Sequence, residues 1–95
     1  MALVVGVCQV ELLLHGCQSL KEKRQVLQSL LERLRNRFNV SVAEIGHQDL
    51  WQRALIGAAV VSNSQPLMDR TLAKILDQIE NTSGVEMIDC LTEVW

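Results

Sequence analysis

Aromatic residues are scarce in this 95-residue sequence, which contains one phenylalanine, two tryptophans and no tyrosine. Sheet surfaces that read single-stranded RNA stack its bases on aromatic side chains of their strands. Segments 3–14 and 53–62, which most resemble central strands, contain no aromatic residue. Base stacking on a sheet is therefore disfavoured, and any contact with nucleic acid is expected to involve phosphate groups.

Motifs for disulfide bonds, metal binding, phosphate binding and catalysis are also absent from the sequence. Cys8, Cys17 and Cys90 are too few, and odd in number, for a disulfide framework. His15 and Cys17 have no CxxC or HxxxH partner, so we expect no metal site. Glycine-rich phosphate-binding loops and nucleophile–histidine arrangements are also missing. The sequence therefore predicts a protein that is not an enzyme and binds no cofactor.

Long hydrophobic runs are absent too. The longest, at 2–8 and 54–61, fall far short of the roughly 20 residues of a membrane helix. No basic segment precedes the first run, so we expect a strand there, not a signal peptide, and a cytoplasmic protein without a membrane partner. The formal net charge of -2 excludes a generally basic nucleic-acid binder but permits a local basic patch. We expect one domain, 1–95.

Apolar periodicity predicts six elements. Strands are expected at 3–14, 40–46, 53–62 and 85–95, and helices from 19 to 38 and from 63 to about 81. Ser19 with Glu22 forms a capping box, and Pro66 fits the first turn of the second helix. The order β-α-β-β-α-β predicts a ferredoxin-like α+β sandwich, with two helices on one face of a four-stranded antiparallel sheet in strand order 4-1-3-2.

Segment 19–38 contains six basic residues and only two acidic ones. Cations in the first turn of a helix interact unfavourably with the helix dipole. The topology places the start of this helix beside the 46–53 connection. We therefore predict a principal anion- or RNA-binding patch of Lys21, Lys23, Arg24 and Arg53, and a secondary patch of Arg35 and Arg37 at the opposite end. In the connection, Gln48, Asp49 and Trp51 are expected to order the loop. An ordinary solvated helix face remains the alternative interpretation of these charges.

The strand patterns point to a second surface. Gln9 and Glu11 indicate which face of strand 3–14 lies away from the helices. The opposite assignment stays open, because both faces of strand 53–62 are apolar. The face with Gln9 and Glu11 would be largely apolar, with Met87 and Trp95 from the last strand, and large exposed apolar patches usually mark interfaces. The predicted self-association residues are Val5, Val7, Leu55, Val61 and Leu91.

Three segments, 19–24 (SLKEKR), 34–44 (LRNRFNVSVAE) and 48–54 (QDLWQRA), closely resemble the bacterial YlxP-like family, whose biochemical role is not established. The resemblance covers essentially the whole chain and implies a small cytosolic ferredoxin-like protein. The genes of the family often neighbour those for translation initiation factor 2 and ribosome-binding factor A, which implies a link to ribosome maturation or translation.

Two hypotheses follow. The first is a non-enzymatic accessory factor that contacts structured or ribosomal RNA through its basic patch. The second is a protein-interaction module, or a homo-oligomer, that uses the apolar sheet face. An enzyme acting on a small anionic ligand ranks third, because no sequence pattern calls for it.

Overall fold

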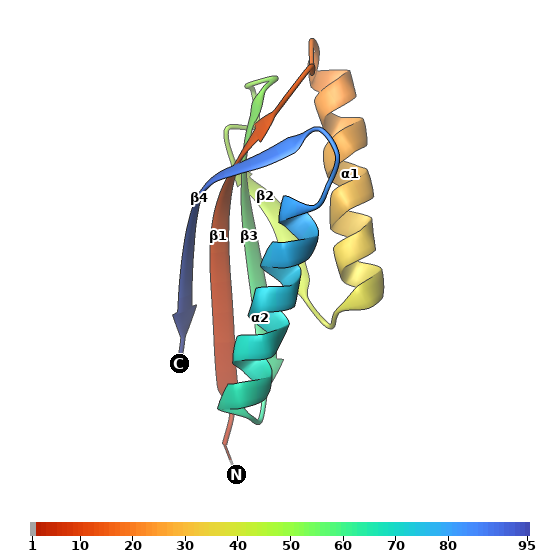
Figure 1. Cartoon of the computed structure of the whole chain (residues 1–95). Helices are drawn as coiled ribbons and strands as arrows, with labels where there is room; N and C mark the ends of the chain where they lie inside the picture. The colour runs from red at the N-terminus through yellow and green to blue at the C-terminus, as the bar shows by residue number, and fades with distance from the viewer. Residues whose placement is uncertain (1) are drawn as a thin grey trace.

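The computed structural model describes residues 2–95, which form a four-stranded antiparallel sheet with two helices on one of its faces (Figure 1). The elements are β1 (Val4–Leu14), α1 (Leu20–Arg37), β2 (Ser41–Gly46), β3 (Arg53–Ser62), α2 (Gln65–Glu80) and β4 (Val85–Val94). The sheet order β2-β3-β1-β4 matches the predicted order 4-1-3-2. The ferredoxin-like α+β fold is therefore confirmed. Neither helix is long and apolar enough to cross a membrane, as judged over the described residues.

Both helices begin at the serine caps that the sequence indicates. The Ser19 hydroxyl accepts a hydrogen bond from the N–H of Glu22 at 3.1 Å, and the Glu22 carboxylate accepts one from the N–H of Gln18 at 2.7 Å. The second bond reaches the residue before the cap, so the motif is a shifted capping box. Ser64 caps α2 in the same way, through the N–H of Leu67. Local sequence thus fixes where each helix starts.

The core lies between the helices and one face of the sheet. Because side chains alternate along a strand, β1 sends Cys8, Val10, Leu12 and Leu14 into the core and its odd-numbered residues to the other side. We call that other side, which carries no helix, the outer face. The helices bury a complementary set: Leu27, Leu30, Leu31, Leu34, Met68, Leu72, Ile75 and Ile79. The predicted faces of β1 and β3 are confirmed.

β4 departs from strict alternation. Glu11 of β1 pairs with Asp89 and the next residue, Leu12, pairs with Met87, so Ile88 is an extra residue on β4 and forms a β-bulge. The bulge turns Met87 toward the helices, where it packs against the core. The prediction that Met87 belongs to the outer face is therefore wrong, whereas Leu91 and Trp95 do lie there, opposite Gln9 and Val5 of β1.

β1 and α2 approach each other closely at Gly6. A Cβ atom at this position would clash with the side-chain sulfur of Met68 and would come within 3.1 Å of Leu72. Met68 is fully buried, so it has little room to move aside. Only a hydrogen atom fits here, and Gly6 therefore sets how closely α2 packs on the sheet.

Gly6→Ala should lower the free energy of unfolding by about 1–3 kcal/mol, because it overpacks the core. Urea denaturation of wild type and variant measures the difference. Gly57→Ala is the matched control, since its new methyl group would meet only the half-exposed side chain of Ile45 on the outer face. Equal losses for the two variants would contradict the close-packing role of Gly6.

Candidate functional site

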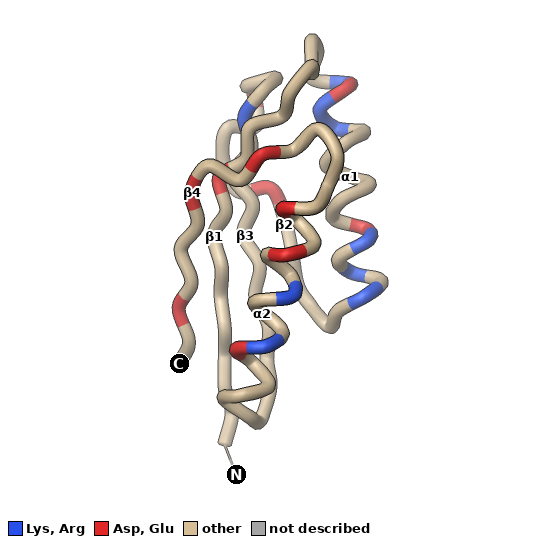
Figure 2. The backbone as a smooth tube through the Cα atoms, in the orientation of Figure 1, with Lys and Arg blue, Asp and Glu red and all other residues tan. Residues whose placement is uncertain are grey.

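Positive charge is concentrated on α1. The helix carries six of the nine basic residues of the chain and only two acidic ones, while the remaining sequence has three basic and nine acidic residues. Figure 2 shows basic positions near both ends of α1 and acidic positions along β4. The charge separation expected from the sequence is therefore present. The individual basic side chains differ in whether they are free to contact a ligand.

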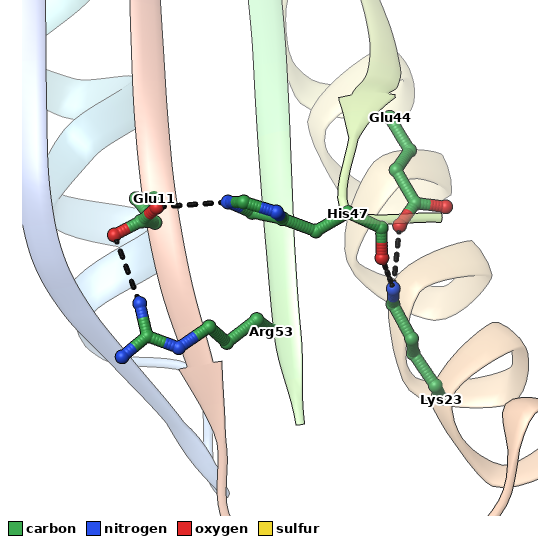
Figure 3. Close-up of polar contacts among 5 residues, drawn as sticks. All are labelled: Glu11, Lys23, Glu44, His47 and Arg53. Atoms are coloured by element: carbon green, nitrogen blue, oxygen red, sulfur yellow. Dashed lines mark hydrogen bonds and ion pairs between the residues drawn. The ribbon is translucent and has the colours of Figure 1, made fainter. Parts of the chain in front are cut away.

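Lys23 is not available to an external ligand. Its side chain is 1% exposed, and its ammonium group forms an ion pair with Oε2 of Glu44 at 2.8 Å and donates a hydrogen bond to the carbonyl oxygen of His47 at 2.6 Å (Figure 3). A buried ammonium group needs such partners, because an uncompensated charge in the interior is strongly unfavourable. The expectation that Lys23 contributes to a basic patch is wrong.

The position of Lys23 in α1 explains its burial. Lys23 precedes Leu27, Leu30 and Leu34 at spacings of four, seven and eleven residues, so it lies on the same stripe that α1 presents to the core. Its aliphatic stem packs in the protein while the terminal amine reaches polar groups. This spacing was the sequence signal that pointed to a buried lysine.

His47 connects the two faces of the sheet. Its backbone has a φ of 59°, an uncommon left-handed value for a residue other than glycine. The carbonyl oxygen accepts hydrogen bonds from Lys23 and from the N–H of Leu50, while the ring extends over β3 toward β1 (Figure 3). There Nε2 is hydrogen-bonded to Oε1 of Glu11 at 2.9 Å. His47 thus joins a buried ion pair to a polar group on the outer face.

Arg53 belongs to the outer face. Its side chain pairs with Oε2 of Glu11 at 3.3 Å, and its backbone is opposite Leu13 in the β1–β3 ladder. α1 packs on the other side of the sheet, so Arg53 is separated from the basic residues of α1. The expectation that Arg53 joins them in one patch is wrong, because cross-strand pairing directs its charge to Glu11.

The other predicted anion-binding residues of α1 fall into two groups. Lys21 and Arg24 are exposed and take part in no ion pair within residues 2–95. Arg35 donates to the carbonyl oxygen of Val42 at 2.8 Å, and Arg37 donates to Oε1 of Gln78 at 3.0 Å. The principal patch therefore consists of Lys21 and Arg24 only. The two arginines predicted as a secondary patch connect α1 to β2 and to α2.

The side chains that hold the loop between β2 and β3 by hydrogen bonds are not those predicted to order it. Gln48, Asp49 and Trp51 make no side-chain hydrogen bond in the described chain, and Trp51 is 53% exposed. The side-chain contacts that hold the loop involve Lys23 and the ring of His47, both described above, and Gln52, whose amide donates to the carbonyl oxygen of Cys17 at 3.2 Å. A loop-ordering role of Gln48, Asp49 and Trp51 stays a prediction.

The predicted self-association residues do share one surface. Val5, Val7, Leu55, Val61 and Leu91 all lie on the outer face, as their strand pairings require. Val61 is 57% exposed and Leu91 is 56% exposed, and Trp95 beside them is 65% exposed. The placement is thus as predicted, while self-association itself stays a prediction.

A groove on the outer face is lined by residues of all four strands. Ala43, Gly57 and Ala59 form the floor of this groove of about 440 Å³, because their side chains are small or absent. Ile45 borders it on the β2 side, and Leu91 and Trp95 border it on the β4 side. The surface therefore combines a shallow hollow with a ridge of large apolar side chains.

Ile45 was missed by the sequence reasoning. It is the extra residue of a second β-bulge, since Glu44 pairs with Ile56 and Gly46 pairs with Leu55. The bulge places the Ile45 side chain over Gly57. An exposed isoleucine followed by glycine at a strand end was the available signal.

Cys8 and Cys17 are buried and unreactive. Burial, with a smaller contribution from nearby Cys90, raises the pKa of Cys8 to about 11. Burial also raises the pKa of Cys17, and the negative charge of Glu22 adds to the shift. Both thiols are therefore protonated at neutral pH and are poor nucleophiles. No three metal-ligating side chains from residues 2–95 lie close enough to hold an ion.

The element order and the sheet order place this chain in the class of small ferredoxin-like α+β proteins. The chain belongs to the family described as Protein of unknown function (DUF503), whose model matches residues 5–92. It is 40% identical over 90 residues to the uncharacterized protein YlxP of Bacillus subtilis (strain 168), a match that covers 95% of this chain and 98% of that protein. The resemblance inferred from the three segments is confirmed.

Two solved structures share the architecture. The de novo designed protein Foldit4 has a TM-score of 0.52 at 16% identity and covers 98% of this chain and 93% of its own. The de novo designed protein Ferredog-Diesel has a TM-score of 0.52 at 15% identity and covers 94% and 83%. At these identities the likeness shows the fold alone.

Lys23→Met should lower the free energy of unfolding by about 2–4 kcal/mol, because it leaves the Glu44 carboxylate without its buried counter-charge. Urea denaturation measures this loss, and Lys23→Met/Glu44→Gln should recover part of it. Lys21→Met, two residues away on the exposed side of α1, is the control and should change stability by less than about 0.5 kcal/mol. Equal effects at 21 and 23 would contradict the structural role of Lys23.

Proposed function

We propose that this protein is a non-enzymatic interaction module whose binding surface is the outer face of its sheet. The observation that supports this is the uncovered apolar surface: both helices pack on the opposite face, and Val61, Leu91 and Trp95 each expose more than half of their side chains. Apolar patches of more than a few hundred Å² are uncommon on monomeric proteins and usually mark interaction sites.

The polar residues on this face fit the same role. Glu11 lies among apolar neighbours, yet its carboxylate is already paired with His47 and Arg53, so a partner need not supply a counter-charge. Asp89 and Glu93 lie on β4, at the edge of the sheet. An apolar centre with charges at the rim is the usual composition of a protein–protein interface.

Leu91→Glu should abolish protein binding without unfolding the chain, because the side chain is exposed and lies on an edge strand. The measurement is affinity capture on the tagged chain in nuclease-treated cell extract, in which further copies of the chain count as partners. Leu67→Glu, the same substitution at an exposed position of α2, should retain every partner. A partner retained by Leu91→Glu and lost by Leu67→Glu would overturn the assignment to the outer face.

A second candidate function is contact with structured RNA, the partner class that the family resemblance implies. It is supported by Lys21 and Arg24, two exposed cations in the first turns of α1 that form no ion pair with another described residue. Cations at a helix start oppose its dipole, so their presence there favours an anionic ligand such as phosphate. With Lys23 buried and Arg53 neutralised, this contact would involve few phosphates.

Lys21→Ala/Arg24→Ala should reduce the salt dependence of RNA binding. Each lost phosphate contact removes about 0.7–0.9 from the slope of log K against log salt, so the pair should remove about 1.4–1.8. A labelled RNA stem-loop titrated at several salt concentrations gives both slopes. Arg70→Ala/Lys74→Ala on α2 carries the same charge change and should leave the slope unaltered. Absence of binding by the wild type, or equal slopes for both variants, would contradict an RNA role.

A further inference from the structure

Two neighbouring rows of the outer face have small side chains on one side of the sheet and larger ones on the other. The pairing registers align side chains into rows across the sheet, in the order β2, β3, β1, β4. One row is Ala43, Gly57, Gln9 and Leu91, and the next is Ser41, Ala59, Val7 and Glu93. In these two rows the small side chains lie on β2 and β3 and the larger ones on β1 and β4, whereas Leu55 and Val61 are large β3 residues in the flanking rows.

From this pattern we infer that the occupant of the outer face is a second copy of this chain, packed face to face with a two-fold axis parallel to the strands. The inference rests on the proposed function of this face. Such an axis places β4 of each copy over β2 of the other, so that Leu91 and Glu93 lie over the small side chains of Ala43 and Ser41. Each favourable contact then occurs twice, as in any two-fold interface.

The alternative two-fold axis runs across the strands and fits poorly. This axis keeps β4 over β4, so the large side chains of Leu91 and Trp95 in one copy would meet the same side chains in the other. The small side chains of β2 and β3 in the two copies would face each other and leave unfilled space between them. Voids of this kind forgo contacts that packed interfaces make. With the axis along the strands, Leu91 is instead opposite Ala43, which lines the groove of about 440 Å³ next to Ile45.

The available area matches what a stable dimer requires. The four strands have 11, 6, 10 and 10 residues. At about 3.3 Å per residue and about 4.8 Å between strands they present a face of roughly 600 Å² before side-chain relief is counted. Standard interfaces bury about 800 Å² on each partner. A face-to-face dimer therefore uses the whole outer face, whereas a small ligand would leave most of it exposed.

Charge is compatible with this arrangement. Glu93 shares a row with Ser41, so the axis along the strands places each Glu93 opposite a serine hydroxyl of the other copy at the rim. There water still reaches the carboxylate, and polar rims are typical of interfaces. Glu11 lies nearer the centre, where it is already paired with Arg53 and His47. Glu11 would thus keep its partners and Glu93 its water in such a dimer.

Crosslinking tests the arrangement directly. Packed sheets are about 10 Å apart, so Leu91 of one copy should lie about 10 Å from Ala43 of the other, while the two copies of Leu91 are also displaced sideways by about 14 Å. In a Cys90→Ser background, which removes the exposed native thiol, Leu91→Cys and Ala43→Cys are made as separate variants. A short bismaleimide crosslinker should give covalent dimers in a mixture of the two and none with either variant alone.

Sedimentation at micromolar concentration completes the test. Wild type and both cysteine variants should sediment as dimers in low and high salt, and Leu91→Glu should sediment as a monomer. A monomeric wild type overturns the inference. A dimer also overturns it if the Leu91→Cys variant crosslinks by itself, or if the mixture of the two cysteine variants does not crosslink. If wild type is monomeric but captures another protein that Leu91→Glu does not, the proposed function stands and only the second copy is refuted.

Discussion

The structure depends on how one buried ammonium group is satisfied. Lys23 lies on the core-facing stripe of α1, and its ammonium group is met there by Glu44 and by the carbonyl oxygen of His47. Those partners come from the end of β2 and the first residue after it. The contact therefore fixes α1 against the β2–β3 connection, and it holds His47 in a left-handed conformation that a histidine rarely adopts.

The conformation of His47 also shapes the outer face. With its carbonyl oxygen directed to Lys23, its ring extends over β3 and meets Glu11, which Arg53 contacts from the other side (Figure 3). A lone carboxylate at this place would oppose the docking of any apolar surface, because desolvating an unpaired charge is costly. The buried lysine on one side of the sheet thus supports a neutral polar cluster on the other side.

Much of the fold was predictable because it is encoded locally. The alternation in β1, the serine caps of both helices and the apolar stripe of α1 are short-range patterns, and they determined the fold and the face assignments. The errors arose where one residue breaks the period. Ile88 and Ile45 are bulge residues, and a bulge changes which face the neighbouring side chains occupy without altering composition. Lys23 was misassigned because a charge was given more weight than its helical spacing.

The edges of the sheet explain why a partner would use its face. β2 is only six residues long and is bulged at Ile45, so it offers a short and irregular ladder for an added strand. β4 is bulged at Ile88 and carries Glu86, Asp89 and Glu93 along its length. Short, bulged and charged edge strands are the features by which proteins avoid edge-to-edge pairing. With both edges protected in this way, the outer face is the apolar surface of the sheet that stays uncovered, which is consistent with the association proposed for it.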